Sequence, residues 1–138
     1  MITYLDSSVV IDRILDEPAS APLWRGIDQT VCSVLVETEC LRAIDRFRIL
    51  GLMDELALVR SRETLYTLIA SSSVVEVGRA VLERAAMPFP SVIRTLDAIH
   101  LATALVYRES AGPLRMATTD RALARASRAM GFEVVGAA

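Results

Sequence analysis

Four acidic side chains occupy sequence positions that are not typical of ordinary solvent-exposed acids. Asp97 opens the almost wholly apolar stretch 95–105, TLDAIHLATAL, and a helix that is apolar around most of its circumference belongs in a protein core. Asp6 follows the apolar run ITYL, Asp120 closes the turn after the run LRMA, and Glu39 lies early in a helical stretch. Because a lone buried charge is costly, we expect these four carboxylates to converge on a shared counter-charge.

A divalent cation suits such a cluster. Crowded carboxylates repel one another, and some stay protonated at neutral pH unless a cation neutralises them. All-oxygen ligands favour Mg²⁺, with Mn²⁺ as a substitute, whereas zinc recruits histidine or cysteine. A water made more acidic by the metal can attack a phosphodiester, and the cation neutralises charge that develops on the phosphate. The residues therefore indicate hydrolysis of a phosphate ester.

The elements that must position these acids alternate between short strands and helices. Hydrophobic periodicity and capping residues predict strands at 2–5, 30–33, 114–117 and 133–135, and helices at 7–15, 34–47, 52–66, 95–111 and 121–130, with a weaker short helix at 23–27. Residues 67–70 fit either a third strand or the end of the preceding helix. The capping-box spacing of Ser73 and Glu76, followed by an apolar stripe, predicts a helix over 73–85.

This alternation indicates an α/β fold of three layers, α/β/α, with a central parallel sheet of four or five short strands. Ligands of such sheets bind beyond the carboxyl ends of the strands. Asp6 and Asp120 are expected at that edge. With 138 residues and neither repeats nor linkers, the chain is expected to form a single domain, 1–138.

Composition excludes several functions. The net charge of −2 argues against coating of nucleic acid by bulk attraction. All 15 basic residues are arginine, so mechanisms that need a lysine are excluded. Cys32 and Cys40 form no CxxC pair and are expected to be reduced packing residues. No long apolar run and no export-signal pattern is present, so we expect a cytoplasmic protein without a membrane partner.

Several motifs occur in order along nearly the whole chain: YLDSS at 4–8, S-x5-E-x2-R at 33–42, RTLDAIHLATA at 94–104 and TTD-x2-L at 118–123. Together they resemble the PIN-domain family, and within it the VapC toxins of bacterial toxin–antitoxin pairs. The resemblance implies a Mg²⁺-dependent endoribonuclease that cuts structured RNA of the translation machinery. It also implies a cognate VapB-type antitoxin that occludes the site, a homodimer and a toxin–antitoxin hetero-oligomer.

Carried over by position, the resemblance gives each candidate residue a role. Asp6 and Asp97 would be the principal metal ligands, and Asp120 would complete the acidic cluster directly or through water. Glu39 would position or deprotonate the attacking water. Ser8 and Thr118 match the supporting hydroxyls. Cys40 departs from the aliphatic residue that is usual after the glutamate.

Each residue also has a structural alternative. Asp6 and Asp120 could simply flank or cap helices, and Glu39 could be a solvated helix acid. Glu37 competes for the role of Glu39, although two positions apart on a helix they cannot face the same way. His100 is expected to be a packed, hydrogen-bonded core histidine rather than a general base or metal ligand.

Three arginines of the last helix, Arg121, Arg125 and Arg128, could touch RNA phosphate, but a solvated face is favoured. Trp24 could anchor an interface or pack locally. A largely apolar surface near Trp24 and residues 50–58 is our candidate for the antitoxin groove, and a basic antitoxin side chain is expected to approach the acids.

Other functions compete with the ribonuclease. A catalytically inactive PIN-fold interaction module would have no use for converging carboxylates. An aspartyl-nucleophile phosphatase would need an Asp-x-Asp after the first strand, where this chain has Ser8. Cleavage of DNA by the same metal chemistry stays open, because nothing in the sequence reads a 2′-hydroxyl.

Overall fold

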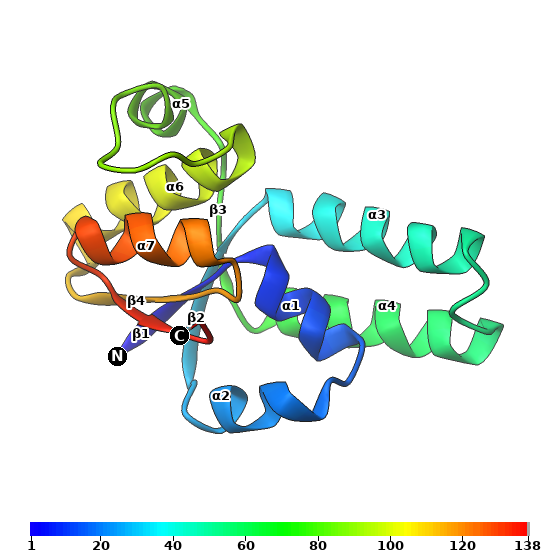
Figure 1. Cartoon of the computed structure of the whole chain (residues 1–138). Helices are drawn as coiled ribbons and strands as arrows, with labels where there is room; N and C mark the ends of the chain where they lie inside the picture. Colours follow the sequence, from blue (N-terminus) through cyan, green and yellow to red (C-terminus); the bar gives the residue numbers. More distant parts are fainter. Residues whose placement is uncertain (138) are drawn as a thin grey trace.

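The structure, a computed structural model, describes residues 1–137 and contains one parallel sheet with the strand order β3-β2-β1-β4-β5 (Figure 1). The strands are β1 (Ile2–Leu5), β2 (Gln29–Ser33), β3 (Ser73–Val75), β4 (Leu114–Ala117) and β5 (Glu133–Val135). The helices are α1 (Ser7–Ile14), the 3-10 turn η1 (Pro18–Ser20), α2 (Ala21–Arg25), α3 (Leu35–Ile49), α4 (Glu55–Ala70), α5 (Arg79–Ala85), α6 (Thr95–Ala111) and α7 (Arg121–Ala129). No helix in this part of the chain is long and apolar enough to cross a membrane.

Two hydrophobic clusters define the layers. Successive strand residues point to opposite faces of a sheet, and in β1 Leu5 packs on one face while Tyr4 packs on the other. The cluster around Leu5 includes residues of α1, α3 and α4, and the cluster around Tyr4 includes residues of α6 and α7. The expected three-layer α/β/α fold with a parallel sheet is confirmed.

The strand order reverses beside β1. From β1 the chain moves outward to β2 and β3, and it then returns to place β4 against the other side of β1, with β5 outermost. Leu5 is in register with Ala117, the last residue of β4. The residues that follow these two strands are therefore neighbours at the carboxyl edge of the sheet, where ligands of α/β folds bind.

The predicted helix over 73–85 is wrong in its first half. Residues Ser73–Val75 form β3, which pairs with β2 in parallel, and only Arg79–Ala85 is helical. The two β-branched residues Val74 and Val75 suit a strand, and pairing with a distant strand overrides the local capping-box signal. Residues 67–70, left open between strand and helix, are the end of α4.

Both cysteines are free and buried, as expected of packing residues. Burial raises the pKa of Cys32 to about 11 and is the main reason why the pKa of Cys40 is raised to about 12. Neither thiol ionises near neutral pH, so neither offers a nucleophile.

Candidate active site

Asp6 is a buried carboxylate held by hydroxyls from two segments. It is 2% exposed and lies directly after β1. Its Oδ2 accepts hydrogen bonds from Ser8 Oγ at 2.6 Å and from Thr118 Oγ1 at 2.8 Å. These bonds fix the side chain and leave Oδ1 free of hydroxyl donors. Ser8 and Thr118 therefore lie where the supporting hydroxyls were expected.

Asp120 is linked to Asp6 through backbone hydrogen bonds to the same two hydroxyls. Its N–H donates to Thr118 Oγ1 at 3.0 Å, and Thr119 N donates to Ser8 Oγ at 3.0 Å. Its Oδ1 accepts from Leu123 N at 2.9 Å, so the side chain caps α7. The capping alternative for Asp120 is therefore correct, but capping occupies one oxygen and leaves Oδ2 for another partner.

Glu39 enters the site from α3 and is held at both oxygens. His100 Nε2 lies 2.7 Å from its Oε1, and Ser7 Oγ donates to its Oε2 at 3.2 Å. Because a carboxylate only accepts hydrogen bonds, Nε2 must carry the proton. Glu39 is therefore not a solvated helix acid, and it, rather than Glu37, makes these contacts.

His100 links the acids to the core. The histidine is fully buried, and its Nδ1 lies 2.8 Å from the Tyr4 hydroxyl, while Nε2 is also 3.8 Å from Asp6 Oδ1. Burial lowers its pKa, but the hydrogen bond to Glu39 and the charges of Asp6, Glu39 and Asp97 outweigh burial and raise it. The expected core histidine is confirmed. Sequence reasoning did not foresee that its partners would be site acids.

Asp97 is the acid most perturbed by its neighbours. It lies in the first turn of α6, one turn before His100 on the same helix. Partial burial, and then the charges of Asp120 and Asp6, raise its pKa to about 6, although His100 lowers it. Glu39 adds a further, smaller increase. Three acids from separate segments thus influence the Asp97 carboxyl group.

The donor set fits a hard cation bound partly through water. Within residues 1–137, no three His, Cys, Asp or Glu side chains are arranged to hold a metal ion directly. Mg²⁺ usually takes only one or two carboxylates and keeps several waters. Burial first, and then the neighbouring carboxylates Asp120 and Asp6, raise the pKa of Asp97, and a cation at this place would offset the repulsion among these acids. A direct ligand set of Asp6, Asp97 and Asp120 stays a prediction.

Two residues of this network were missed by sequence reasoning. Ser7 is the first residue of the predicted helix, and its hydroxyl donates to Glu39, a contact that the sequence pattern does not indicate. Tyr4 was read only as part of a buried strand. The helical step from Asp97 to His100 was the one available signal that the histidine faces the acids.

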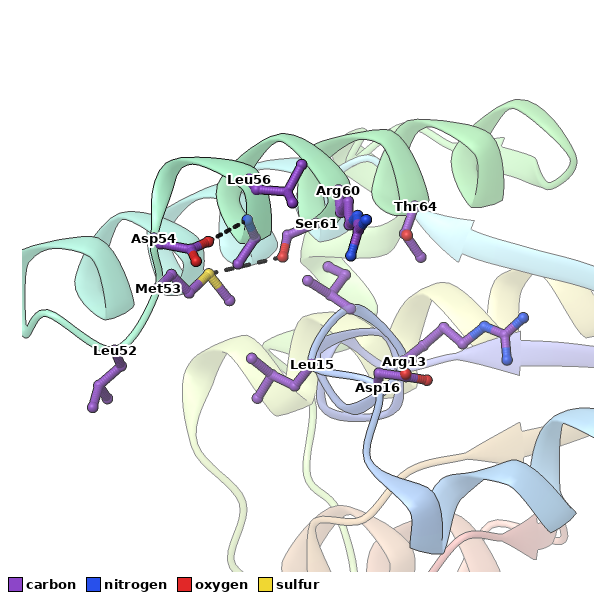
Figure 2. A pocket seen from close by; sticks show the side chains of 12 residues that line it. Arg13, Leu15, Asp16, Leu52, Met53, Asp54, Leu56, Arg60, Ser61 and Thr64 are labelled. Atoms are coloured by element: carbon purple, nitrogen blue, oxygen red, sulfur yellow. Dashed lines mark hydrogen bonds between the residues drawn. The ribbon is translucent and has the colours of Figure 1, made fainter.

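The structure also contains a cavity that lies away from the four acids. Figure 2 shows this space of about 660 Å³ between the end of α1 and the start of α4, with Arg13, Asp16, Met53 and Leu56 among its lining residues. It contains none of the four acids. Nearby, Trp24 packs against the core cluster of Leu5, with the Arg13 guanidinium 5.4 Å from its ring. Of the two alternatives for Trp24, the structure therefore shows local packing.

Comparison with known proteins places this geometry in a family. The family model of the PIN domain matches residues 3–129, and the chain belongs to the PIN-domain family. It is 34% identical over 137 residues to "Ribonuclease VapC46" of Mycobacterium tuberculosis, covering 96% of this chain and 95% of that protein. It is therefore a VapC-type member, as the motifs indicated.

Solved structures agree on the fold. A toxin–antitoxin complex from Klebsiella pneumoniae matches with a TM-score of 0.62 at 18% identity, over 88% of this chain and 90% of that chain. The structure of VapBC2 from Rickettsia felis bound to a DNA fragment from its promoter matches with a TM-score of 0.61 at 11% identity, over 97% of both chains. At these identities the likeness shows the shared fold.

Proposed function

We propose that this chain, as a single domain of residues 1–138, is the toxin of a toxin–antitoxin pair and a Mg²⁺-dependent endoribonuclease. The observation that carries the proposal is the convergence of Asp6, Glu39, Asp97 and Asp120 at the edge where the strand order reverses. The closeness of the acids, whose charges add to burial in raising the pKa of Asp97, supports a cation at this place, and Mn²⁺ is expected to substitute for Mg²⁺. The relative named as a ribonuclease supports RNA as the substrate.

In this mechanism Asp6, Asp97 and Asp120 would hold the ion, directly or through water. When bound, the ion makes a water more acidic and neutralises charge on the phosphate. Glu39 accepts the proton of the attacking water, because a carboxylate has about four lone-pair sites and only two are occupied by His100 and Ser7. Ser8 and Thr118 keep Asp6 oriented.

The substrate and partners follow from the same proposal. We propose structured RNA of the translation machinery, cut in the cytoplasm, as the substrate. A VapB-type antitoxin would cover the site with a basic side chain that pairs with the acids. The matched toxin–antitoxin complex supports such a partner. A homodimer and a toxin–antitoxin hetero-oligomer complete the proposed assembly.

Cutting of RNA by purified protein tests the proposal. Asp97→Asn should keep the fold, judged by circular dichroism, and lower the cutting rate at saturating Mg²⁺. Loss of a metal ligand removes several kcal/mol of transition-state stabilisation, which corresponds to at least about a hundredfold at about 1.4 kcal/mol per tenfold. Full activity in Asp97→Asn would refute the site, and no cutting by the native protein would favour the interaction module.

A matched pair of variants on α3 tests the role of Glu39. Glu39→Gln should lower the rate by about 10²- to 10⁴-fold, the usual worth of a positioned general base. Glu37→Gln changes the same charge two positions away and should cut as the native protein does. Equal loss in both variants would mean that net charge, rather than proton transfer at Glu39, controls the rate.

A further inference from the structure

A second cavity lies between the two segments that deliver Asp97 and Asp120. It has a volume of about 350 Å³ and is lined by Ser91, Val92, Arg121, Ala122 and Arg125. Ser91 and Val92 belong to the loop 86–94, which leads into α6, and the other three residues form the first turns of α7. The volume falls within the range of about 300–1,000 Å³ that holds small-molecule-sized ligands.

The arginines of this cavity are unpaired although acids are close in sequence. Arg121 is the neighbour of Asp120, and Arg125 lies one turn further along the exposed side of α7. Within residues 1–137 neither side chain has an ion pair, a hydrogen bond or a ring contact. By contrast, Arg48 pairs with Asp45, and Arg128 donates to Ala137 O.

The opposite wall offers an apolar contact and an unused hydroxyl. Val92 is 92% exposed, so its side chain is available for contact with a ligand in the cavity. Ser91 Oγ is buried and has no hydrogen-bond partner, and such an orphaned polar group calls for an explanation. Rotation about its Cα–Cβ bond would offer this hydroxyl to a ligand in the cavity.

We propose that this cavity is a subsite for one nucleotide of single-stranded RNA beside the bond that is cut. Arg121 and Arg125 bind its phosphate, which guanidinium groups match well, and the base lies against Val92. Unpaired bases in RNA loops are the part of a structured RNA that can enter such a cavity. This inference rests on the proposed function, because it assigns the substrate strand of the same site.

Binding and cutting of RNA by the full chain test the subsite. The probe for binding is a short fluorescent single-stranded RNA of mixed sequence, titrated in EDTA so that it is not cut. Arg121→Gln/Arg125→Gln should raise Kd about tenfold or more, as expected for hydrogen bonds to a charged group. The slope of log Kd against log salt should fall by about 0.7, because both arginines bind one phosphate and each lost phosphate contact lowers the slope by about 0.7 in a single strand.

Two further variants separate the contacts. Val92→Ser should raise Kd several-fold with an unchanged salt slope, because it removes an apolar contact and no charge. Arg46→Gln/Arg62→Gln removes the same charge from exposed positions on α3 and α4, on the other side of the molecule from α7 (Figure 1). This control should bind and cut RNA as the native protein does.

The outcomes distinguish a failure of the proposed function from a failure of the subsite alone. A native protein that neither binds nor cuts RNA removes the proposed function and the subsite with it. A native protein that cuts RNA, with an unchanged Kd and salt slope in Arg121→Gln/Arg125→Gln, overturns the subsite alone. Equal weakening of RNA binding in Arg46→Gln/Arg62→Gln also overturns the subsite. So does a result in which Arg121→Gln/Arg125→Gln weakens antitoxin binding alone.

Discussion

The pKa of Asp97 depends on the charges of the other acids in the cluster. Its pKa of about 6 lies above the ordinary value near 4, because of burial first and then Asp120 and Asp6. Protonation of Asp97 therefore adds stability that is complete below about pH 4 and is lost as the pH rises through about 6. Saturating Mg²⁺ should remove this dependence and lower the apparent pKa.

A pair of helix-capping aspartates tests the coupling within the cluster. Asp120 and Asp54 both accept a hydrogen bond from the backbone N–H three residues on, at 2.9 and 2.8 Å. Asparagine is also a good cap, so Asp120→Asn and Asp54→Asn should cost little stability. NMR titration should show a lower pKa for Asp97 in Asp120→Asn and no change in Asp54→Asn. An unshifted pKa in Asp120→Asn would place Asp120 too far away to share an ion.

His100 is expected to act as a positioning residue for Glu39. In His100→Leu, the buried Tyr4 hydroxyl and Glu39 Oε1 lose their partner, which should lower the free energy of unfolding by about 1–3 kcal/mol. Cutting should also fall, with a larger effect on kcat than on KM, because Glu39 is no longer aimed. Tyr4→Phe should cost about 1 kcal/mol and keep most of kcat. An unchanged kcat in folded His100→Leu would contradict the role.

At the scale of elements, the glycine that follows the last strand supports the site. Gly136 has a φ of +100°, and a Cβ there would lie 2.7 Å from the carbonyl oxygen of Thr118, the residue that holds Asp6. Gly51 has a φ of +71° but open space around it. Both alanine variants should lose about 1–2 kcal/mol from the left-handed conformation. Gly136→Ala should lose more, and only it should slow cutting.

Denaturant unfolding and cutting rates of Gly136→Ala and Gly51→Ala provide the measurement. Equal stability loss and equal rates in the two variants would show that the backbone of Thr118 can shift without disturbing Asp6. The comparison isolates the close approach, because the two glycines share the sign of φ and differ in what surrounds them.

Local pattern was enough to predict the elements that present Asp6, Asp97 and Asp120. Asp6 and Asp120 each follow a buried strand, and the stretch around Asp97 is a helix whose following residues are largely buried. Local pattern failed at Ser73–Val75, because a three-residue edge strand is decided by its pairing with β2. Such pairing depends on residues about forty positions away, which periodicity does not detect.

The partners within the site were less predictable than its acids. Helical spacing places His100 on the side of Asp97, but its bonds to Tyr4 and Glu39 span 96 and 61 positions. These contacts arise because β1, α3 and α6 meet at one edge of the sheet. Only the assembled fold, and not the periodicity of any one segment, sets which polar group faces the histidine.

At the scale of the whole molecule, the acids and the proposed antitoxin groove lie in different regions. The candidate groove is the surface near Trp24 and residues 50–58, where Leu50, Leu52 and Leu56 are 57%, 67% and 57% exposed. Leu52 and Leu56 also line the cavity in Figure 2. An amphipathic partner helix typically lays its apolar face into a groove lined by such exposed apolar side chains. A partner could therefore bind here while its basic side chain reaches the acids.

This separation predicts that antitoxin binding and cutting can be uncoupled. Leu52→Asp should weaken binding of the proposed VapB-type antitoxin by about thirtyfold, the effect of losing about 2 kcal/mol at an interface hot spot. The free variant should cut RNA at the native rate. Leu82→Asp on α5, where the leucine is 48% exposed, should leave antitoxin binding unchanged. Sedimentation without antitoxin distinguishes an antitoxin-binding surface from a dimer interface. If the native protein is a dimer and Leu52→Asp dissociates it, this surface serves self-association.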